Sequence, residues 1–433
     1  MSITRTTLLP LPYLVAAAIA YVAAAAGVAW LGPELAGHYY QPRILALTHT
    51  LTLGWITMSI MGASCQLVPV ALERPLWSPR LARWQFVIFL VGVVGMVGHF
   101  FIGQWSGLAW SAALVGIACV MHVLNVVLSV RDLPRWHFTA RLVMIALAGL
   151  VLTVVFGFAL AADKIWRFMP PSLFLNLHAH AHVALLAWVA PMIIGVGARV
   201  YPMFLLAPEP KGWLARVQVW GIVLGTVGVT AGLLTDRAVL TIAGALAASA
   251  ALTGHLVWLV QMIRRRKRPQ LDRGLRLVVT AAAFLPVAIA LGLGFALDVI
   301  QGPRMALAYA VVVIGGWVSL TIAGMMLKIV PFLVWYRVYA PVAGKAPVPS
   351  LTDLSPAWAE RAAYVLLTAG TVALAIFAGL GDAAGIRVSG VVLTGGALAF
   401  GAALGAPLRL MRRRGRPSGA TGPLLIVGGK RSA

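Results

Sequence analysis

The chain has 433 residues, of which 61% are hydrophobic and only 10% are charged, and its formal net charge is +23. A soluble domain carries about 25% charged residues, so this composition excludes an ordinary globular protein and favours one embedded in a lipid bilayer. The chain has only 2 cysteines, which excludes a disulfide framework, and we interpret the positive charge as a sign of membrane topology and not of a nucleic-acid partner.

Apolar segments long enough to cross a bilayer, about 20 residues each, recur along the whole chain. They are expected at residues 9–31, 42–71, 82–104, 106–130, 141–162, 172–206, 213–235, 238–263, 274–298, 303–333, 357–380 and 385–411. The sequence therefore predicts an all-α membrane protein with twelve transmembrane helices. We expect residues 334–356 to form a cytoplasmic connector and residues 415–433 to form a disordered tail.

The distribution of basic residues predicts the orientation in the membrane. Lysine and arginine are concentrated in the loops on one side of a twelve-helix path, most densely at residues 264–268. Because basic loops stay in the cytoplasm, we expect a multi-pass protein of the cytoplasmic membrane with both termini inside. The first apolar segment shows no small-residue cleavage site, so we interpret it as helix one and not as a signal peptide.

One pattern recurs in the helices expected at 42–71, 172–206 and 303–333. A tryptophan is followed by glycine after seven residues, by a polar residue after eleven and by proline after fourteen. The three sets are Trp55, Gly62, Gln66 and Pro69; Trp188, Gly195, Arg199 and Pro202; and Trp317, Gly324, Lys328 and Pro331. The sequence therefore predicts three pseudo-symmetric four-helix repeats within one membrane domain. The repeats are expected at residues 9–135, 141–268 and 274–414.

Each member of this pattern suggests a role. We expect the tryptophans to pack, the glycines to allow close helix approach, and the prolines to end or kink each helix. If the three helices surround an axis, Gln66, Arg199 and Lys328 would form a polar ring at the cytoplasmic end. That ring would either contact an anion or a quinol headgroup, or consist of side chains that reach out to the interface.

Histidines occupy equivalent positions in the first two repeats and not in the third. His49 and His182 lie six residues before the pattern tryptophan, where the third helix has Val311, and they are 133 residues apart. His122 and His255 are separated by the same offset. Since polar side chains inside a membrane are costly, these histidines are candidate functional residues. We expect His49 and His182 to be the axial ligands of a haem. His122 and His255 are expected to be a second haem pair or structural hydrogen-bonding residues.

The sequence His178-Ala-His180-Ala-His182 is the densest group of candidate ligands. Residues four apart share a face of a helix, so His178 and His182 point the same way while His180 points away from both. Neutral imidazole suits iron, copper and zinc, so these three histidines and His49 form the predicted metal-ligating set. The run is expected to serve a second haem or a metal, on two sides of one helix.

Two arginines are candidate partners for haem propionates. Arg43 lies six residues outward of His49, where its guanidinium would meet the outer rim of a haem. Arg304 begins helix ten in a Gly-Pro-Arg context and is the second candidate.

Two segments resemble an element of a known family. Residues 180–204, HAHVALLAWVAPMIIGVGARVYPMF, resemble the histidine-bearing tenth helix of subunit I of the haem-copper oxidases, especially the C-class enzymes with b-type haems. Residues 48–70, THTLTLGWITMSIMGASCQLVPV, resemble the same element. The resemblance implies that family's architecture of twelve helices in three pseudo-symmetric groups of four. It also implies that the His-x-His residues His180 and His182 bind one high-spin and one low-spin haem.

The departures from that family concern its catalytic centre. The oxidases require a histidine pair on helix seven for their copper site, whereas residues 213–235 contain no histidine. Carboxylates, which proton channels normally use, are confined to loops and helix ends. We therefore do not expect a proton-pumping oxygen reductase. The chain looks more like a divergent relative in the manner of the NnrS-type proteins, which are bacterial inner-membrane haem proteins associated with nitric oxide stress.

Two classes of function stay open at this point. The first is a membrane protein with one or two haems b that carries electrons or reacts with nitric oxide or another small gas, its electron partner being a quinol or a periplasmic donor. Whether it is an oxidoreductase is an open alternative. The second is a haem-free transporter or metal-handling protein, in which His178, His180 and His182 carry copper with Met192 and Met203.

Overall fold

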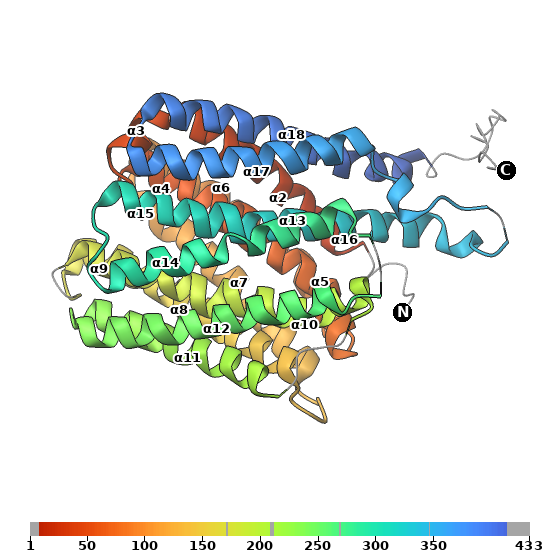
Figure 1. The fold of residues 1–433 in the computed structure, drawn as a ribbon, viewed down its shortest axis with the longest axis horizontal. Helices are drawn as coiled ribbons and strands as arrows, with labels where there is room; N and C mark the ends of the chain where they lie inside the picture. The colour runs from red at the N-terminus through yellow and green to blue at the C-terminus, as the bar shows by residue number, and fades with distance from the viewer. Residues whose placement is uncertain (1–7, 170–171, 208–211, 268–269, 346, 414–433) are drawn as a thin grey trace.

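The structure is a computed structural model that describes residues 8–169, 172–207, 212–267, 270–345 and 347–413. Within these ranges, 12 helical spans are long and apolar enough to cross a membrane. They run side by side along the long axis of the molecule (Figure 1). The expectation of an all-α, multi-pass membrane protein is confirmed, and the tail predicted at 415–433 lies outside the described residues.

Some of the described spans are single α-helices and others are composite. The single helices are α2 (Pro10–Trp30), α6 (Pro79–Ile102), α8 (Phe138–Trp166), α11 (Trp213–Leu234), α12 (Ala238–Arg264), α17 (Ala357–Leu380) and α18 (Ala383–Arg413). The composite spans are α4 (Pro42–His49) with η1 (Thr50–Thr57) and α5 (Met58–Leu72); η2 (Trp105–Gly107) with α7 (Leu108–Val130); α9 (Leu173–His182) with η3 (Val183–Val189) and α10 (Ala190–Leu205); α13 (Arg273–Ala282) with α14 (Leu285–Ala296); and α15 (Pro303–Ala310) with η4 (Val311–Ser319) and α16 (Leu320–Val338). Short helices α3 (Gly32–Gly37), η5 (Ala340–Val342) and η6 (Leu351–Asp353) lie between spans.

Helices nine and ten differ from their predicted bounds. The helix expected at 303–333 continues to Val338, which shortens the predicted connector. The helix expected at 274–298 is interrupted between Ala282 and Leu285. Pro286 lies in the first turn of α14 and has no backbone N–H to donate to the preceding turn, which accounts for the interruption there.

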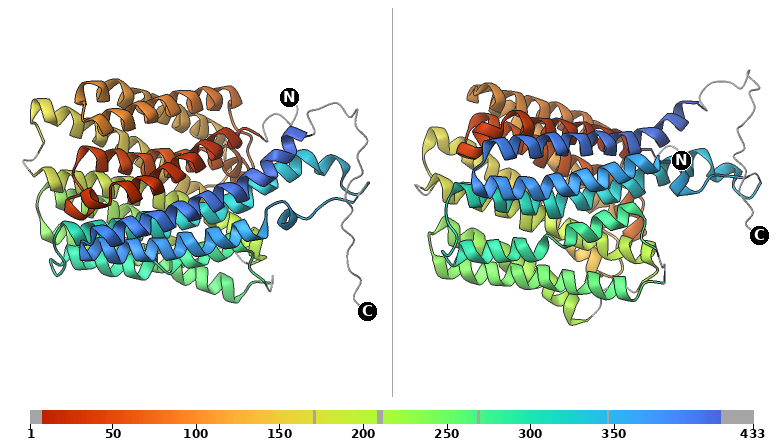
Figure 2. Two further views of the ribbon diagram at one scale, coloured as in Figure 1. Left: turned by 90° about the horizontal axis from the view of Figure 1, so that it is seen from above. Right: turned by 45° about the horizontal axis from the view of Figure 1, so that its top comes forward.

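Three antiparallel hairpins lie on different flanks of the bundle, α6 with α7, α11 with α12 and α17 with α18 (Figures 1 and 2). In each, a glycine brings the two helices together. A Cβ atom at that glycine would lie only 2.8–3.1 Å from the backbone nitrogen of a residue 23 positions later. The pairs are Gly92 with Val115, Gly225 with Ala248, and Gly370 with Leu393.

Each helix that carries the tryptophan pattern contains a π-helical segment, namely η1, η3 and η4. These segments include the pattern tryptophans, and the first two begin directly after His49 and His182. The π-helix accounts for well under 1% of residues in proteins and often marks a functional site. Its recurrence at one register in three helices was not predicted from the sequence.

The pattern tryptophans are buried and bond the pattern helices to one another. The indole Nε1 of Trp55 donates to Ser319 Oγ at 3.0 Å, and that of Trp188 donates to Thr57 Oγ1 at 3.3 Å. Both acceptors lie two residues after a pattern tryptophan. The equivalent residue of the remaining helix is Ala190, which has no hydroxyl. These bonds therefore connect η3 with η1, and η1 with η4, around a shared centre.

The pattern glycines and prolines also have defined roles. A Cβ atom on each glycine would lie 2.4–2.7 Å from the nearest atom of another helix, so the expected close approach is confirmed. The contacts are Gly62 with Tyr13 of α2, Gly195 with Leu142 of α8, and Gly324 with Gly274 of α13. Pro69 and Pro202 lie three residues before the ends of α5 and α10, whereas α16 continues for seven residues past Pro331.

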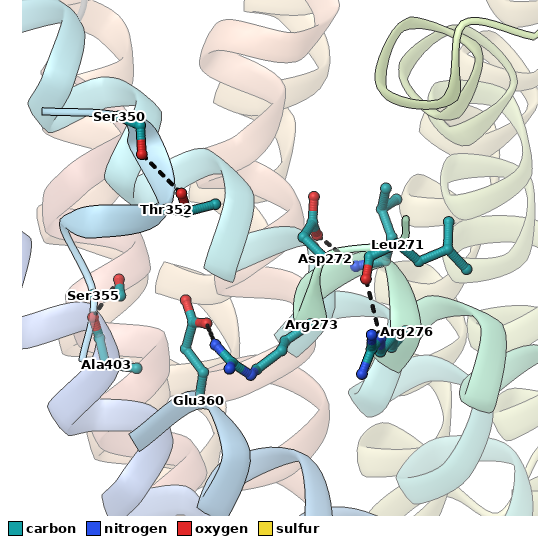
Figure 3. A network of polar contacts seen from close by, with 10 residues as sticks. Leu271, Asp272, Arg273, Arg276, Ser350, Thr352, Ser355, Glu360 and Ala403 are labelled. Atoms are coloured by element: carbon teal, nitrogen blue, oxygen red, sulfur yellow. Dashed lines mark hydrogen bonds and ion pairs between the residues drawn. The ribbon is translucent and has the colours of Figure 1, made fainter. Parts of the chain in front are cut away.

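The end of the bundle where α2 begins and α18 ends is called the basic end. Polar contacts join α13, α17 and α18 there. Arg273 Nη1 donates to Glu360 at 2.8 Å and so links α13 to α17 (Figure 3). Ser355 Oγ donates to the carbonyl of Ala403 at 3.0 Å. The side chains of Arg273 and Glu360 are 27% and 15% exposed, so water screens this ion pair less than a pair at a fully open surface.

Candidate functional site

His49 and His182 are held in the same way at the far end of the bundle from the basic end. His49 Nδ1 donates to the carbonyl of Leu45 at 2.7 Å, and His182 Nδ1 donates to the carbonyl of His178 at 2.8 Å. A carbonyl only accepts, so Nδ1 carries the hydrogen in both rings and Nε2 keeps its lone pair. Histidines that bind metals usually fix their second ring nitrogen in this way. In both rings Nε2 is therefore the nitrogen that could bind a ligand.

His180 turns to the opposite side of α9. Its ring lies over Phe156, with ring centres 6.0 Å apart, and its Cε1 atom lies 3.3 Å from where a Cβ atom of Gly157 would be. Its Nδ1 atom is buried and has no hydrogen-bond partner among the described residues. Since a buried polar atom without a partner costs free energy, this ring is a candidate to bind a group from outside the chain.

The structure brings these histidines near residues of other pattern helices. His49 on α4 lies in the neighbourhood of His180 on α9. The ring of His182 lies against that of Tyr309 in α15, with ring centres 6.3 Å apart and planes 28° from parallel. His180 and Tyr309 both lie eight residues before a pattern tryptophan, so the two contacts are equivalent by position.

His178 is engaged by a tyrosine from the loop that precedes α4. The Tyr39 hydroxyl and His178 Nε2 form a hydrogen bond of 2.8 Å. His38 and Phe174 pack around this pair, with the rings of His38 and Tyr39 stacked at 4.7 Å. Burial raises the pKa of the Tyr39 hydroxyl. His178 thus belongs to an aromatic cluster at the far end, and its Nε2 atom already has a protein partner.

His122 and His255 lie deep in the bundle and have different neighbours. Gln85 Nε2 donates to His122 Nδ1 at 3.4 Å, so the ring hydrogen of His122 sits on Nε2, the reverse of His49 and His182. The His122 ring meets Trp188 edge-on at 6.2 Å. His255 lies beside Trp258, with ring centres 5.9 Å apart.

The sequence interpretation missed two buried glutamines, one of which bonds to His122. Gln85 and Gln218 are both 0% exposed, and Gln218 Nε2 donates to the carbonyl of Leu214 at 3.1 Å. The glutamines are separated by 133 residues, the offset that joins His122 to His255. A search for every polar residue at that offset would have found them.

The candidate propionate partners lie at the far end of the bundle. Arg43 Nη1 donates to Glu34 at 3.0 Å, and its guanidinium lies 5.5 Å from the centre of the Phe101 ring. Arg304 packs against the end of α17, where a Cβ atom on Gly381 would collide with its side chain. Both arginines are therefore near the level of the histidines, and Arg43 is held by an exposed ion pair.

Two of the three polar pattern residues are paired with carboxylates and do not form a free polar ring. Arg199 Nη2 donates to Glu73 at 3.0 Å, and Lys328 Nζ forms an ion pair with Asp272. The Gln66 Oε1 atom is buried without a hydrogen-bond partner among the described residues. The interpretation of Arg199 and Lys328 as side chains that reach the interface agrees with these contacts better than an anion site does.

The copper alternative depends on several ligands meeting at one point. Among the residues that the structure describes, no group of three or more histidine, cysteine, aspartate or glutamate side chains is arranged to hold a metal ion. Met203, which was expected to assist, is 52% exposed. Cys65 and Cys119 are free and buried, as expected.

No protein-family model matches the chain, and no curated protein matches it.

Proposed function

We propose that this chain is an integral membrane haem protein that carries electrons or binds a small gas such as nitric oxide. The observation that supports it most is the shared geometry of His49 and His182, whose Nδ1 atoms bond to their own helix and leave Nε2 to a ligand. Neutral imidazole is the axial ligand that b-type haem takes in many proteins, so the donor set fits this group.

His49 and His180 are the proposed axial ligands of one haem. The two residues lie in the same neighbourhood on different pattern helices, and the Nδ1 atom of His180 is buried and unpaired among the described residues. The pair of His49 and His182 that the sequence suggested stays the alternative pairing. His182 is proposed to hold a second haem, with Tyr309 beside it. Arg43 is the proposed propionate contact, in competition with Glu34.

The side chains around these ligands would keep water away from the site. Phe100 stacks on His49 with ring centres 4.7 Å apart, and Trp105 covers Phe100 edge-on at 5.9 Å. Phe156 covers His180 in a similar way. A bound haem supplies one-electron redox chemistry, and a free axial position on it admits a diatomic gas.

His122, His255 and His178 are outside the proposed ligand set. His122 carries its hydrogen on Nε2 because Gln85 donates to Nδ1, and His178 Nε2 is bonded to Tyr39. His255 packs beside Trp258 within its own group. We assign His178 to the packing of the bundle. His122 Nε2 and His255 Nδ1 are buried without a hydrogen-bond partner among the described residues, as His180 Nδ1 is, so a second haem stays the alternative role for these two histidines.

The architecture that we propose is three pseudo-symmetric four-helix repeats, as in subunit I of the haem-copper oxidases. Three observations support it: π segments at one register, glycine contacts 23 residues apart in all three hairpins, and tryptophan bonds that run in one direction around the centre. The chain resembles a divergent relative of these oxidases in the manner of the NnrS-type proteins, and this resemblance suggests a bacterial inner membrane. The basic end would face the cytoplasm. A quinol or a periplasmic protein would supply electrons, and an oxidoreductase activity would follow.

A haem-free copper or other metal transporter is the second candidate. It is favoured by the run His178, His180 and His182. It ranks lower because these rings turn to different neighbours, namely Tyr39, Phe156 and Tyr309. Transport through this run would need those rings to converge.

The test is a dithionite-reduced minus oxidised spectrum of the detergent-solubilised protein, with haem quantified as its pyridine complex. We expect sharp α bands and one or two haems b per chain. H49A and H180A should each remove the same haem, so that the double variant loses no more than either single variant. H182A should remove the other.

The matched control is H38A, which removes a histidine at the far end that we do not assign to haem. Its haem content should equal that of the unsubstituted protein. Protein from haem-replete cells without a Soret band would rule out the proposal and would direct attention to metal analysis and transport. Loss of different haems in H49A and H180A would rule out the pairing alone.

A further inference from the structure

A cavity of about 80 Å³ lies between α5, α10 and α16, beyond the π segments toward the basic end. Its lining repeats with the tryptophan pattern. Each of the three helices contributes the residues 4, 5, 8, 9 and 12 positions after its pattern tryptophan. The cavity is therefore on the line about which the three helices are arranged, and it is separate from the histidines, none of which lines it.

The hydroxyl groups in the lining are committed to the protein. Ser64 Oγ donates to the carbonyl of Ile60 at 2.6 Å, and Thr321 Oγ1 donates to the carbonyl of Trp317 at 2.6 Å. Ser59 Oγ donates to the sulfur of Met326 at 3.7 Å. The Tyr201 hydroxyl is the one further side-chain polar group in the lining. The oxygens of the committed hydroxyls can still accept, but the lining offers a water few donors, so an apolar guest meets little competition from water there.

The remaining lining is apolar and polarisable. Met192, Met325 and Met326 bring three thioether groups to the cavity, among isoleucine, valine, leucine and alanine side chains. Sulfur contributes strong dispersion contacts to an uncharged guest. An engineered apolar cavity of roughly 150 Å³ binds benzene or xenon. At about 80 Å³, this cavity has room for xenon or a diatomic molecule and not for a ring.

We propose that this axial cavity is a binding site for a small, uncharged, apolar molecule of the size of xenon or a diatomic gas. The proposal does not depend on haem, because it rests on the volume, the committed hydroxyls and the thioethers alone. Occupancy of the cavity would stabilise the contact between the three helices, since a guest restores the dispersion contacts that an empty space lacks.

The experiment is xenon pressurisation of crystals of the full chain, with anomalous scattering to locate the xenon. We expect a xenon peak between Ala63, Met192 and Met326. A63L should abolish that peak by filling the cavity from α5. The matched control is A148L, which makes the same change at an exposed position on α8, and it should keep the peak.

A second variant guards against a change of fold in A63L. M192A enlarges the same cavity and should increase xenon occupancy at a given pressure. Xenon absent from the unsubstituted protein would overturn the proposal. So would an axial peak that persists in A63L, or an ordered water or lipid chain in the cavity. These outcomes are independent of haem content, so failure here leaves the haem proposal standing.

Discussion

At the scale of single residues, the hydrogen bond on one ring nitrogen distinguishes His49 and His182 from His122. In His49 and His182 the bond to the preceding turn leaves Nε2 free, whereas in His122 a glutamine places the hydrogen on Nε2. The sequence identified all three as candidates, because polar groups in membrane helices are rare and costly. It did not indicate which ring nitrogen of each histidine, Nδ1 or Nε2, would keep a lone pair for a ligand.

The contact between Tyr39 and His178 gives a test at this scale. Y39F removes the hydrogen bond of 2.8 Å and should lower the free energy of unfolding by about 1 kcal/mol at neutral pH. The measurement is the thermal midpoint in detergent. Y336F, at a position that is 39% exposed, is the control and should change little.

The pH dependence of that difference follows from the raised pKa of Tyr39. The folded state holds the Tyr39 proton more tightly than the unfolded state, so this stabilisation is present below the unfolded pKa of about 10 and is lost as pH rises further. The difference in the free energy of unfolding between the unsubstituted protein and Y39F should therefore shrink in alkaline buffer. A difference that stays constant would contradict the argument that burial raises the pKa of Tyr39.

At the scale of elements, the pattern helices combine a π segment with a tryptophan that bonds to the neighbouring helix. The sequence predicted the three helices and the glycine contacts, because spacing along a helix fixes which side chains share a face. It did not predict the π segments, since a π turn depends on packing between helices and has no strong residue signature. The sequence also did not indicate which residue accepts the hydrogen bond of each tryptophan, because that residue lies on a different pattern helix.

The bond from Trp188 to Thr57 should contribute measurable stability. T57V keeps the shape of the side chain and leaves the indole N–H without its acceptor, so we expect a loss of about 0.5–2 kcal/mol. S319A should have a similar effect through Trp55. The two effects should be less than additive if the bonds support one arrangement. Full additivity in a double-variant cycle would indicate independent contacts.

The hairpin glycines allow a matched comparison within α6. G92A places a Cβ atom 2.8 Å from the Val115 nitrogen, which forces the helices apart and should cost about 1–3 kcal/mol. In G98A the added Cβ atom meets open space, and alanine forms helices better than glycine does. The thermal midpoint of G98A should therefore equal or exceed that of the unsubstituted protein. Equal destabilisation of both variants would show that helix contact is not what makes Gly92 necessary.

At the scale of the whole molecule, membrane class and helix number followed from composition and length, which a bilayer constrains strongly. The proximity of His49 to His180 did not follow from the sequence. The two residues are 131 positions apart, and no periodicity indicates that they are neighbours. Their proximity depends on how the pattern helices pack, which is a property of the assembled bundle.

The orientation can be measured by thiol labelling in intact cells. K345C lies between α16 and α17 at the basic end, and Q301C lies at the far end between α14 and α15. A membrane-impermeant reagent should label Q301C from outside and K345C only after lysis, because basic loops stay in the cytoplasm. The native cysteines, Cys65 and Cys119, are buried and should give little background. The reverse labelling would invert the proposed topology.

The tryptophan bonds also bear on the order in which the molecule assembles during synthesis. Trp188 bonds to Thr57, and Ser319 accepts from Trp55, so the second and third pattern helices both attach to the first, whereas Ala190 offers the third pattern helix no hydroxyl. The first pattern helix is also made before the other two, and later segments fold onto those already made. The N-terminal helices would thus serve as a template on which each later insertion is completed.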